Sequence, residues 1–315
     1  MSLTSTRTFA DNQSLVVAIG AIGKDTGVPT VAGPVRTSDG IEIAIHDLGG
    51  SGPPVLFAHA TGLHGLVWQP VAARLAPAFR CVSFDHRGHG DSDGAPGLDF
   101  DWHGLGRDAL AVAEALGSPL VAVGHSSGAA ALLLAEQARP GTFAALYCYE
   151  PIVVAADPPL GRDTGNWLAA GARRRREVFA SHAEAHDHYS AKPPFARWAP
   201  EALASYVDNG FEDLPDGTVR LKCRGESEAL VYEMASAHDG FARMSDVRCP
   251  VLLASGSDSD ALGPAIIRSL QDRLPDSRTE ELPRIGHFGP LEDPPAVAAS
   301  IERFLADVGP SIRFF

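Results

Sequence analysis

A serine in a glycine-flanked pentapeptide is the first candidate for chemistry. Gly124-His125-Ser126-Ser127-Gly128 follows the short apolar run 120–123 and precedes the apolar stretch 129–135. A sharp turn from a strand into a helix projects a serine hydroxyl above a sheet, and the flanking glycines leave room for that turn. The alternative is a tight turn whose serine only caps the helix. We take Ser126 as the candidate nucleophile.

A serine hydroxyl is a weak nucleophile unless a base takes its proton. Of the 12 histidines, His287 alone combines a late position, a flanking glycine and a loop between the run 278–282 and the last helical stretch. A structural surface histidine is the alternative interpretation. We therefore expect His287 to be the base.

Acyl transfer also needs N–H donors for the developing oxyanion. The residue after the nucleophile, Ser127, supplies the first donor by its position. In the loop Phe57-Ala58-His59-Ala60-Thr61-Gly62, the N–H of Thr61 is the best candidate for the second. We expect His59 to brace this loop rather than to act as a base.

Strand and helix patterns alternate around these residues. Short apolar or alternating runs predict strands, and longer periodic stretches predict helices between them. The predicted strands are 41–45, 54–58, 79–84, 120–123, 144–149, 250–254 and 278–282, and the predicted helices are 67–75, 104–116, 128–138, one from Pro264 and 295–308. This order predicts an α/β fold with right-handed crossovers and a mostly parallel sheet covered by helices on both faces.

The alternation has two interruptions. Residues 1–33 mix Ser, Thr, Gly and Pro without periodicity and are expected to form an N-terminal extension. Residues 152–245 hold no run like the buried strands and are rich in Ala, Arg, Glu and His, which predicts a mostly helical cap. The core would then comprise residues 34–151 and 246–315.

As a set, these motifs resemble the α/β-hydrolase superfamily. The resemblance rests on the serine elbow, the loop His59–Gly62, the stretch Asp85-His86-Arg87-Gly88-His89-Gly90-Asp91-Ser92 and Gly286-His287. It covers roughly residues 35–150 and 248–308, and it implies an eight-stranded type of sheet with a lid before the late strands. The lid segments 192–198, 206–210 and 216–223 also resemble a subgroup of fungal peroxisomal lipase-like and toxin-cluster hydrolases.

The acid that orients the histidine is the open member of the set. Most relatives place it three residues beyond a glycine after the strand at 250–254. Counted from Gly256, that position is Ser259, with Asp258 and Asp260 on either side. Some relatives place the carboxylate at the end of the preceding strand, where this chain has Glu150. Because a buried glutamate needs a partner such as an imidazole N–H, we rank Glu150 first, Asp258 second and Asp260 third.

Aromatic side chains are expected to line an apolar substrate pocket, although packing is the alternative explanation. The candidates in the predicted cap and beside the catalytic loops are His59, Trp68, Trp167, Phe195, Trp198, Phe211 and Phe288.

Composition excludes several other functions. The net charge of −13 argues against nucleic acid and anionic lipid as partners. Four scattered cysteines give no disulfide framework or zinc pattern, and no apolar run approaches the ~20 residues that span a bilayer. We expect a cytoplasmic protein, monomeric or homodimeric, that acts on a small molecule without a metal or organic cofactor.

The predicted activity is hydrolysis of an ester or lactone by a serine nucleophile through an acyl-enzyme. Epoxide hydrolases and haloalkane dehalogenases resemble the chain in layout, but they use an aspartate where Ser126 stands. Two alternatives stay open, namely hydrolysis of a C–C bond in a β-diketone and a ligand-binding sensor with little turnover.

Overall fold

The computed structural model describes residues 33–309 except 96, 98 and 194. The predicted extension 1–33 therefore lies almost wholly outside the described residues.

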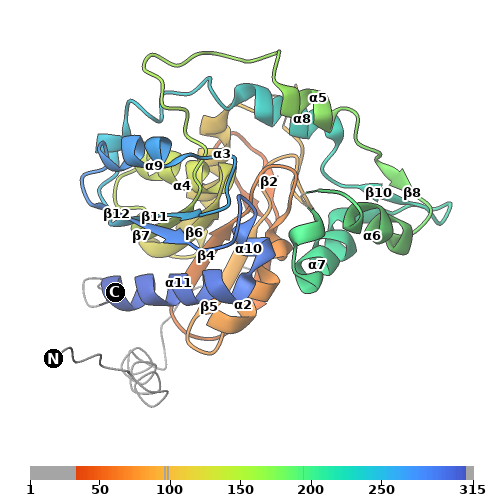
Figure 1. The fold of residues 1–315 in the computed structure, drawn as a ribbon, viewed down its shortest axis with the longest axis horizontal. Helices are drawn as coiled ribbons and strands as arrows, with labels where there is room; N and C mark the ends of the chain where they lie inside the picture. Colours follow the sequence, from red (N-terminus) through yellow and green to blue (C-terminus); the bar gives the residue numbers. More distant parts are fainter. Residues whose placement is uncertain (1–32, 96, 98, 194, 310–315) are drawn as a thin grey trace.

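Seven strands form the main sheet of the described chain (Figure 1). They are β3 (Ile45–Gly49), β4 (Pro54–Ala58), β5 (Arg80–Phe84), β6 (Leu120–His125), β7 (Phe143–Tyr149), β11 (Val251–Gly256) and β12 (Ser277–Leu282). Their spatial order is β12-β11-β7-β6-β4-β5-β3, and every neighbouring pair is parallel except β3 with β5. The mostly parallel sheet is thus confirmed. The short strands β1 (Val35–Arg36) and β2 (Glu42–Ile43) pair with each other rather than adding an eighth strand.

Helices cover both faces of this sheet. One face carries α2 (Gln69–Leu75), which follows the 3-10 helix η1 (Gly65–Trp68), and α11 (Pro294–Val308), while α3 (Trp102–Ala115), α4 (Ser127–Ala138) and α9 (Pro264–Gln271) lie on the other. Successive side chains of β4 alternate between two cores, Val55 and Phe57 on the α2 side and Leu56 and Ala58 on the α4 side. Strands buried on both faces explain why the sequence shows continuous apolar runs. Within the described ranges, no helix combines the length and apolarity needed to cross a membrane.

The chain between β7 and β11, here called the intervening segment, packs beside the carboxyl ends of the strands (Figure 1). It contains α5 (Trp167–Ala172), β8 (Val178–Phe179), α6 (His182–Ser190), η3 (Phe195–Arg197), α7 (Pro200–Gly210), β9 (Phe211–Asp213), β10 (Val219–Leu221), α8 (Gly225–Met234) and η4 (Met244–Asp246). Most of its regular structure is helical, and three short strands, β8, β10 and β9, add a small antiparallel sheet that the sequence did not predict. Strands of two or three residues are too short to show an alternating pattern.

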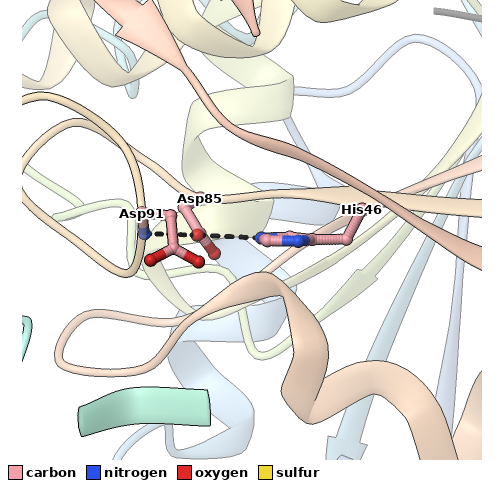
Figure 2. Close-up of side chains that lie close together, drawn as sticks. All are labelled: His46, Asp85 and Asp91. Atoms are coloured by element: carbon pink, nitrogen blue, oxygen red, sulfur yellow. Dashed lines mark hydrogen bonds and ion pairs between the residues drawn. The ribbon is translucent and has the colours of Figure 1, made fainter. Parts of the chain in front are cut away.

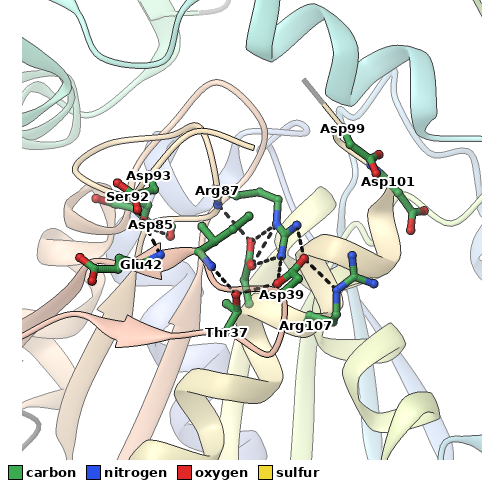
Figure 3. A network of polar contacts seen from close by, with 12 residues as sticks. Thr37, Asp39, Glu42, Asp85, Arg87, Ser92, Asp93, Asp99, Asp101 and Arg107 are labelled. Atoms are coloured by element: carbon green, nitrogen blue, oxygen red, sulfur yellow. Dashed lines mark hydrogen bonds and ion pairs between the residues drawn. The ribbon is translucent and has the colours of Figure 1, made fainter. Parts of the chain in front are cut away.

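A buried arginine fixes the turn after β5. Arg87 donates from Nη2 to Asp108 of α3 at 2.6 Å and from Nη1 to Asp39 at 2.9 Å, as Figure 3 shows around the labelled Arg87 and Asp39. Arg87 is only 3% exposed and Asp108 is fully buried, so each charge depends on the other for hydrogen bonds. The stretch 85–92 is therefore held against α3 and against the turn between β1 and β2. This structural role explains why the stretch is a motif of the fold.

Candidate active site

Ser126 occupies a strained turn between β6 and α4. Its backbone has φ 56° and ψ −119°, a conformation that L-residues rarely adopt. The turn needs glycine at position 128, because a Cβ there would lie 2.5 Å from the carbonyl oxygens of both Ala58 and His59. The helix thus starts against the end of β4. This close approach brings the serine next to the loop that contains Thr61.

His287 lies in the loop between β12 and the short helix α10 (Gly289–Glu292). Its Nε2 is 3.2 Å from Oγ of Ser126, and its Nδ1 is 2.7 Å from Oε2 of Glu150. A neutral imidazole with its proton on Nδ1 donates to the carboxylate and presents a free Nε2 lone pair to the hydroxyl. This arrangement can take the serine proton and return it.

Glu150 follows the last residue of β7 and is fully buried, with φ 45°. Its Oε1 accepts the N–H of Gly256 at 3.0 Å, and its Oε2 accepts the hydroxyl of Ser259 at 2.7 Å in addition to the imidazole. Three donors offset the cost of burying the carboxylate. Ser259, at the position that the resemblance implies for the acid, here donates to the carboxylate at the end of the neighbouring strand.

The two alternative acids lie elsewhere. Asp258 has a side chain that is 46% exposed and pairs with Arg197 at 3.3 Å. Asp260 is exposed, and within the part of the chain that the structure describes neither aspartate contacts the imidazole of His287. Of the three candidates, the structure brings only Glu150 to the histidine.

The two candidate oxyanion donors lie side by side. The hydroxyl of Thr61 donates to Oγ of Ser127 at 2.9 Å. Ser127 is the first residue of α4, where backbone N–H groups have no intrahelical acceptor. Across the described residues, no protein acceptor takes the N–H of Thr61 or of Ser127. Both groups are thus available to a ligand oxygen.

Two buried histidines brace the loop around Thr61. Nδ1–H of His59 donates to the Ala60 carbonyl at 2.8 Å, and its Nε2 accepts the N–H of His86 at 3.0 Å. Nε2 of His89 accepts the N–H of Gly62 at 3.0 Å. Burial lowers the pKa of His59 to about 3, so this residue is neutral at physiological pH. Because both of its nitrogens are used and its side chain is fully buried, the expectation that His59 lines a substrate pocket was wrong.

The predicted pocket residues divide into two groups. Phe195, Trp198 and Phe288 form a chain of ring contacts that reaches His287, with centroid separations of 4.6, 5.5 and 5.3 Å. Phe211 is buried among Phe179, Tyr189 and Tyr206 within the intervening segment.

Two tryptophans do not belong to this chain of rings. Trp68 packs on Phe57 in the core with 2% exposure, because η1 turns it toward the sheet. Trp167 is 77% exposed at the start of α5. We therefore correct the expectation that these two residues line the pocket.

The sequence interpretation missed the residues that hold the His287 loop. Nε2–H of His125 donates to the carbonyl of His287 at 2.8 Å, and the Tyr149 hydroxyl donates to the carbonyl of Gly286 at 2.7 Å. Glu292 accepts the N–H of Gly286 at 3.0 Å. His125 directly precedes Ser126, and Tyr149 directly precedes Glu150. The two residues also pair with each other in the β6–β7 register. Their positions beside the nucleophile and the acid were the sequence signal that could have identified them.

One group of side chains has a metal-like composition. Figure 2 shows His46, Asp85 and Asp91 close together beside β3 and β5. Their atoms already have protein partners, because His46 Nε2 is 2.8 Å from Asp85, Asp85 accepts the N–H of Asp91 at 2.8 Å and Asp91 pairs with Lys222 at 2.6 Å. This set explains the local structure without an ion, and we assign no metal to it.

Comparisons with known proteins place this geometry in context. A model of the alpha/beta hydrolase family matches residues 55–300. A putative non-heme bromoperoxidase of Mycobacterium tuberculosis is 27% identical over 84% of this chain and 97% of its own. The peroxisomal alpha-beta-hydrolase of Saccharomyces cerevisiae has a TM-score of 0.73 at 20% identity, covering 91% of this chain and 88% of its own. An E-2-(acetamidomethylene)succinate hydrolase has a TM-score of 0.75 at 22% identity, covering 87% and 98%.

Proposed function

Because the chain belongs to the alpha/beta hydrolase family, we propose that its activity is hydrolysis of a carboxylic ester or lactone by Ser126 through an acyl-enzyme. One observation carries this proposal. A continuous chain of hydrogen-bonding groups runs from Ser126 through both nitrogens of His287 to the buried carboxylate of Glu150. A serine that only caps a helix has no use for this chain.

In the first half-reaction, Nε2 of His287 takes the proton of Ser126 as Oγ attacks the carbonyl carbon of the substrate. The carbonyl π-electrons move to oxygen, and the resulting oxyanion accepts the N–H groups of Thr61 and Ser127. The tetrahedral intermediate then collapses and the bond to the leaving oxygen breaks. His287 gives its proton to that oxygen, and the acyl group stays on Ser126. The alcohol of an ester leaves, whereas the hydroxyl formed from a lactone stays attached to the acyl group.

In the second half-reaction, a water molecule is the nucleophile. His287 takes one proton from the water, the hydroxide attacks the acyl carbon, and the same two N–H groups hold the oxyanion. Collapse returns the proton to Oγ of Ser126 and releases the carboxylic acid. Glu150 keeps its charge throughout and stabilises the imidazolium that forms in each half-reaction.

The substrate is proposed to be a small to medium apolar molecule. The rings of Phe195, Trp198 and Phe288 extend from the base into the intervening segment, and an apolar acyl or alcohol group is compatible with these neighbours. We propose in addition that residues 152–245 form a cap over a core made of residues 34–151 and 246–315. In this arrangement the cap supplies most of the substrate contacts.

A fluorophosphonate probe tests the proposal without knowledge of the natural substrate. We expect covalent labelling at Ser126, seen by intact mass and peptide mapping, and turnover of p-nitrophenyl butyrate. Ser126→Ala is the matched control, and it should lose both labelling and turnover while its thermal unfolding midpoint is retained. A folded wild-type protein that neither labels nor turns over this ester, but binds ligands tightly, would favour the sensor alternative. Cleavage of a β-diketone in preference to simple esters would favour the C–C hydrolase.

A further inference from the structure

An ion pair of the intervening segment packs against the loop that contains Thr61. Arg175, between α5 and β8, donates from Nη1 to Oε2 of Glu228 on α8. The side chains are only 17% and 9% exposed. A buried pair of this kind gains little net stability, but removal of one partner leaves the other as a costly uncompensated charge.

Glu228 lies directly on the turn next to Thr61. A Cβ built at Gly62 would lie 2.7 Å from Oε1 of Glu228 and 3.4 Å from Nη1 of Arg175. With φ +78°, Gly62 leaves the space in which the carboxylate sits. The carboxylate of Glu228 therefore packs against Gly62, the residue that follows the proposed oxyanion donor Thr61.

The guanidinium of Arg175 is fixed in place by phenol groups. Its Nη2 donates to the hydroxyls of Tyr189 and Tyr206, at 3.0 and 2.5 Å. The titratable side chains that act on or are acted on by Glu228 are Arg175, His89, Tyr206, Cys223 and Tyr232. Burial lowers the pKa of His89, which leaves Arg175 as the permanent cation of this group.

Without its cation, Glu228 would disfavour the proposed reaction. An unpaired carboxylate in a partly desolvated site repels a developing oxyanion nearby, and the repulsion is larger than in water because the effective dielectric constant is lower. A cation bonded to that carboxylate cancels most of its field. The carboxylate of the pair also packs against Gly62 of the loop.

We propose that Arg175 is a positioning residue of the reaction, which neutralises Glu228 and keeps this carboxylate packed against the loop that carries the Thr61 oxyanion donor. This inference rests on the proposed function. It assigns to the intervening segment a part in transition-state stabilisation, in addition to its contacts with the substrate.

Charge-rescue variants test the proposal. In Arg175→Gln, Glu228 loses its cation, and we expect kcat for p-nitrophenyl butyrate to fall by about tenfold or more while KM changes by less than about threefold. The double variant Arg175→Gln/Glu228→Gln has no unpaired charge and should recover to within about threefold of the wild-type kcat. Arg175→Lys keeps the charge and should retain most activity. Each variant is assayed at pH 7 and at pH 9.

The matched control is Tyr206→Phe, which removes one hydrogen bond to Arg175 without changing any charge, and each variant is checked by its thermal unfolding midpoint. A double variant as slow as Arg175→Gln at both pH values would overturn the proposal, because the loss of turnover would then not come from the unpaired charge of Glu228. A kcat of Arg175→Gln equal to that of the wild type at both pH values would also overturn it. Failure of the proposed function is distinct, since the wild-type protein itself would then show neither turnover nor fluorophosphonate labelling.

Discussion

Nε2–H of His125 donates a hydrogen bond to the backbone carbonyl of His287, 2.8 Å away. The ring is 1% exposed, and burial next to His287 holds the pKa of His125 well below its usual range. His125 is therefore a neutral donor that anchors the backbone of the proposed base. It is the last residue of β6, directly before Ser126, so the end of one strand positions both the nucleophile and the loop of the base.

Loss of this donor should weaken catalysis more than stability. In His125→Phe the carbonyl of His287 loses its partner and the imidazole can shift, so we expect kcat/KM for p-nitrophenyl butyrate to fall by about tenfold to a hundredfold. His125→Gln retains an N–H donor of similar reach and should recover part of the loss. Equal activity of His125→Phe and the wild type would contradict the anchoring role.

Glu150, rather than Asp258, should be the acid on which turnover depends. Glu150→Gln leaves the shape of the site intact but favours the wrong imidazole tautomer, so we expect kcat to fall by about 10³ to 10⁴. Asp258→Asn removes only an exposed partner of Arg197 and should stay within about threefold of the wild type. Steady-state kinetics and the rate of fluorophosphonate labelling give this comparison. A larger loss in Asp258→Asn than in Glu150→Gln would reverse the assignment.

Local patterns predicted the sheet, its flanking helices and the positions of Ser126 and His287, because both residues lie in short loops next to long, strongly patterned elements. The acid could only be ranked. Whether Glu150 or Asp258 reaches the imidazole depends on how far the ends of the neighbouring strands β7 and β11 lie from His287. A local sequence pattern does not give these distances. The same limit explains why the Arg175–Glu228 pair was missed, since its members are 53 positions apart.

Errors about aromatic residues have a different cause. Trp68 and Trp167 have the same residue type as Trp198, yet one is in the core, one is in solvent and one contacts Phe288. Residue type alone does not give the direction of a side chain on a short or irregular element. Prediction therefore succeeded where periodicity fixes the buried face and failed on the short helices η1 and α5.

Gly128 should be more sensitive to substitution than an ordinary helical glycine. In Gly128→Ala the new methyl group would lie 2.5 Å from two backbone carbonyl oxygens, so we expect a loss of about 1 to 3 kcal/mol in the free energy of unfolding and a loss of turnover. Gly171→Ala in α5 is the control, because a Cβ there meets nothing within 4 Å and alanine favours the helix. Urea unfolding of both variants gives the comparison. Similar effects at the two positions would refute the close approach of α4 to β4.

Buried neutral histidines should make the fold sensitive to acid. Burial lowers the pKa of His59 to about 3 and the pKa values of His64 and His238 to about 4. In the unfolded chain these groups bind protons near pH 6.5, while in the folded protein they stay neutral until lower pH. The unfolded state therefore binds more protons in this window, and stability falls as pH drops from about 6.5 toward 4.

A single substitution can measure the contribution of one histidine. His238 accepts the N–H of Gly240 through Nδ1 at 3.2 Å, and the amide oxygen of asparagine can take over this role without titrating. We expect His238→Asn to reduce the slope of unfolding free energy against pH by up to about 1.4 kcal/mol per pH unit between pH 4 and 6.5. Urea unfolding at four or five pH values gives both slopes. Parallel curves for the variant and the wild type would show that His238 is already protonated in the folded protein, against the burial that its contacts with Trp102 impose.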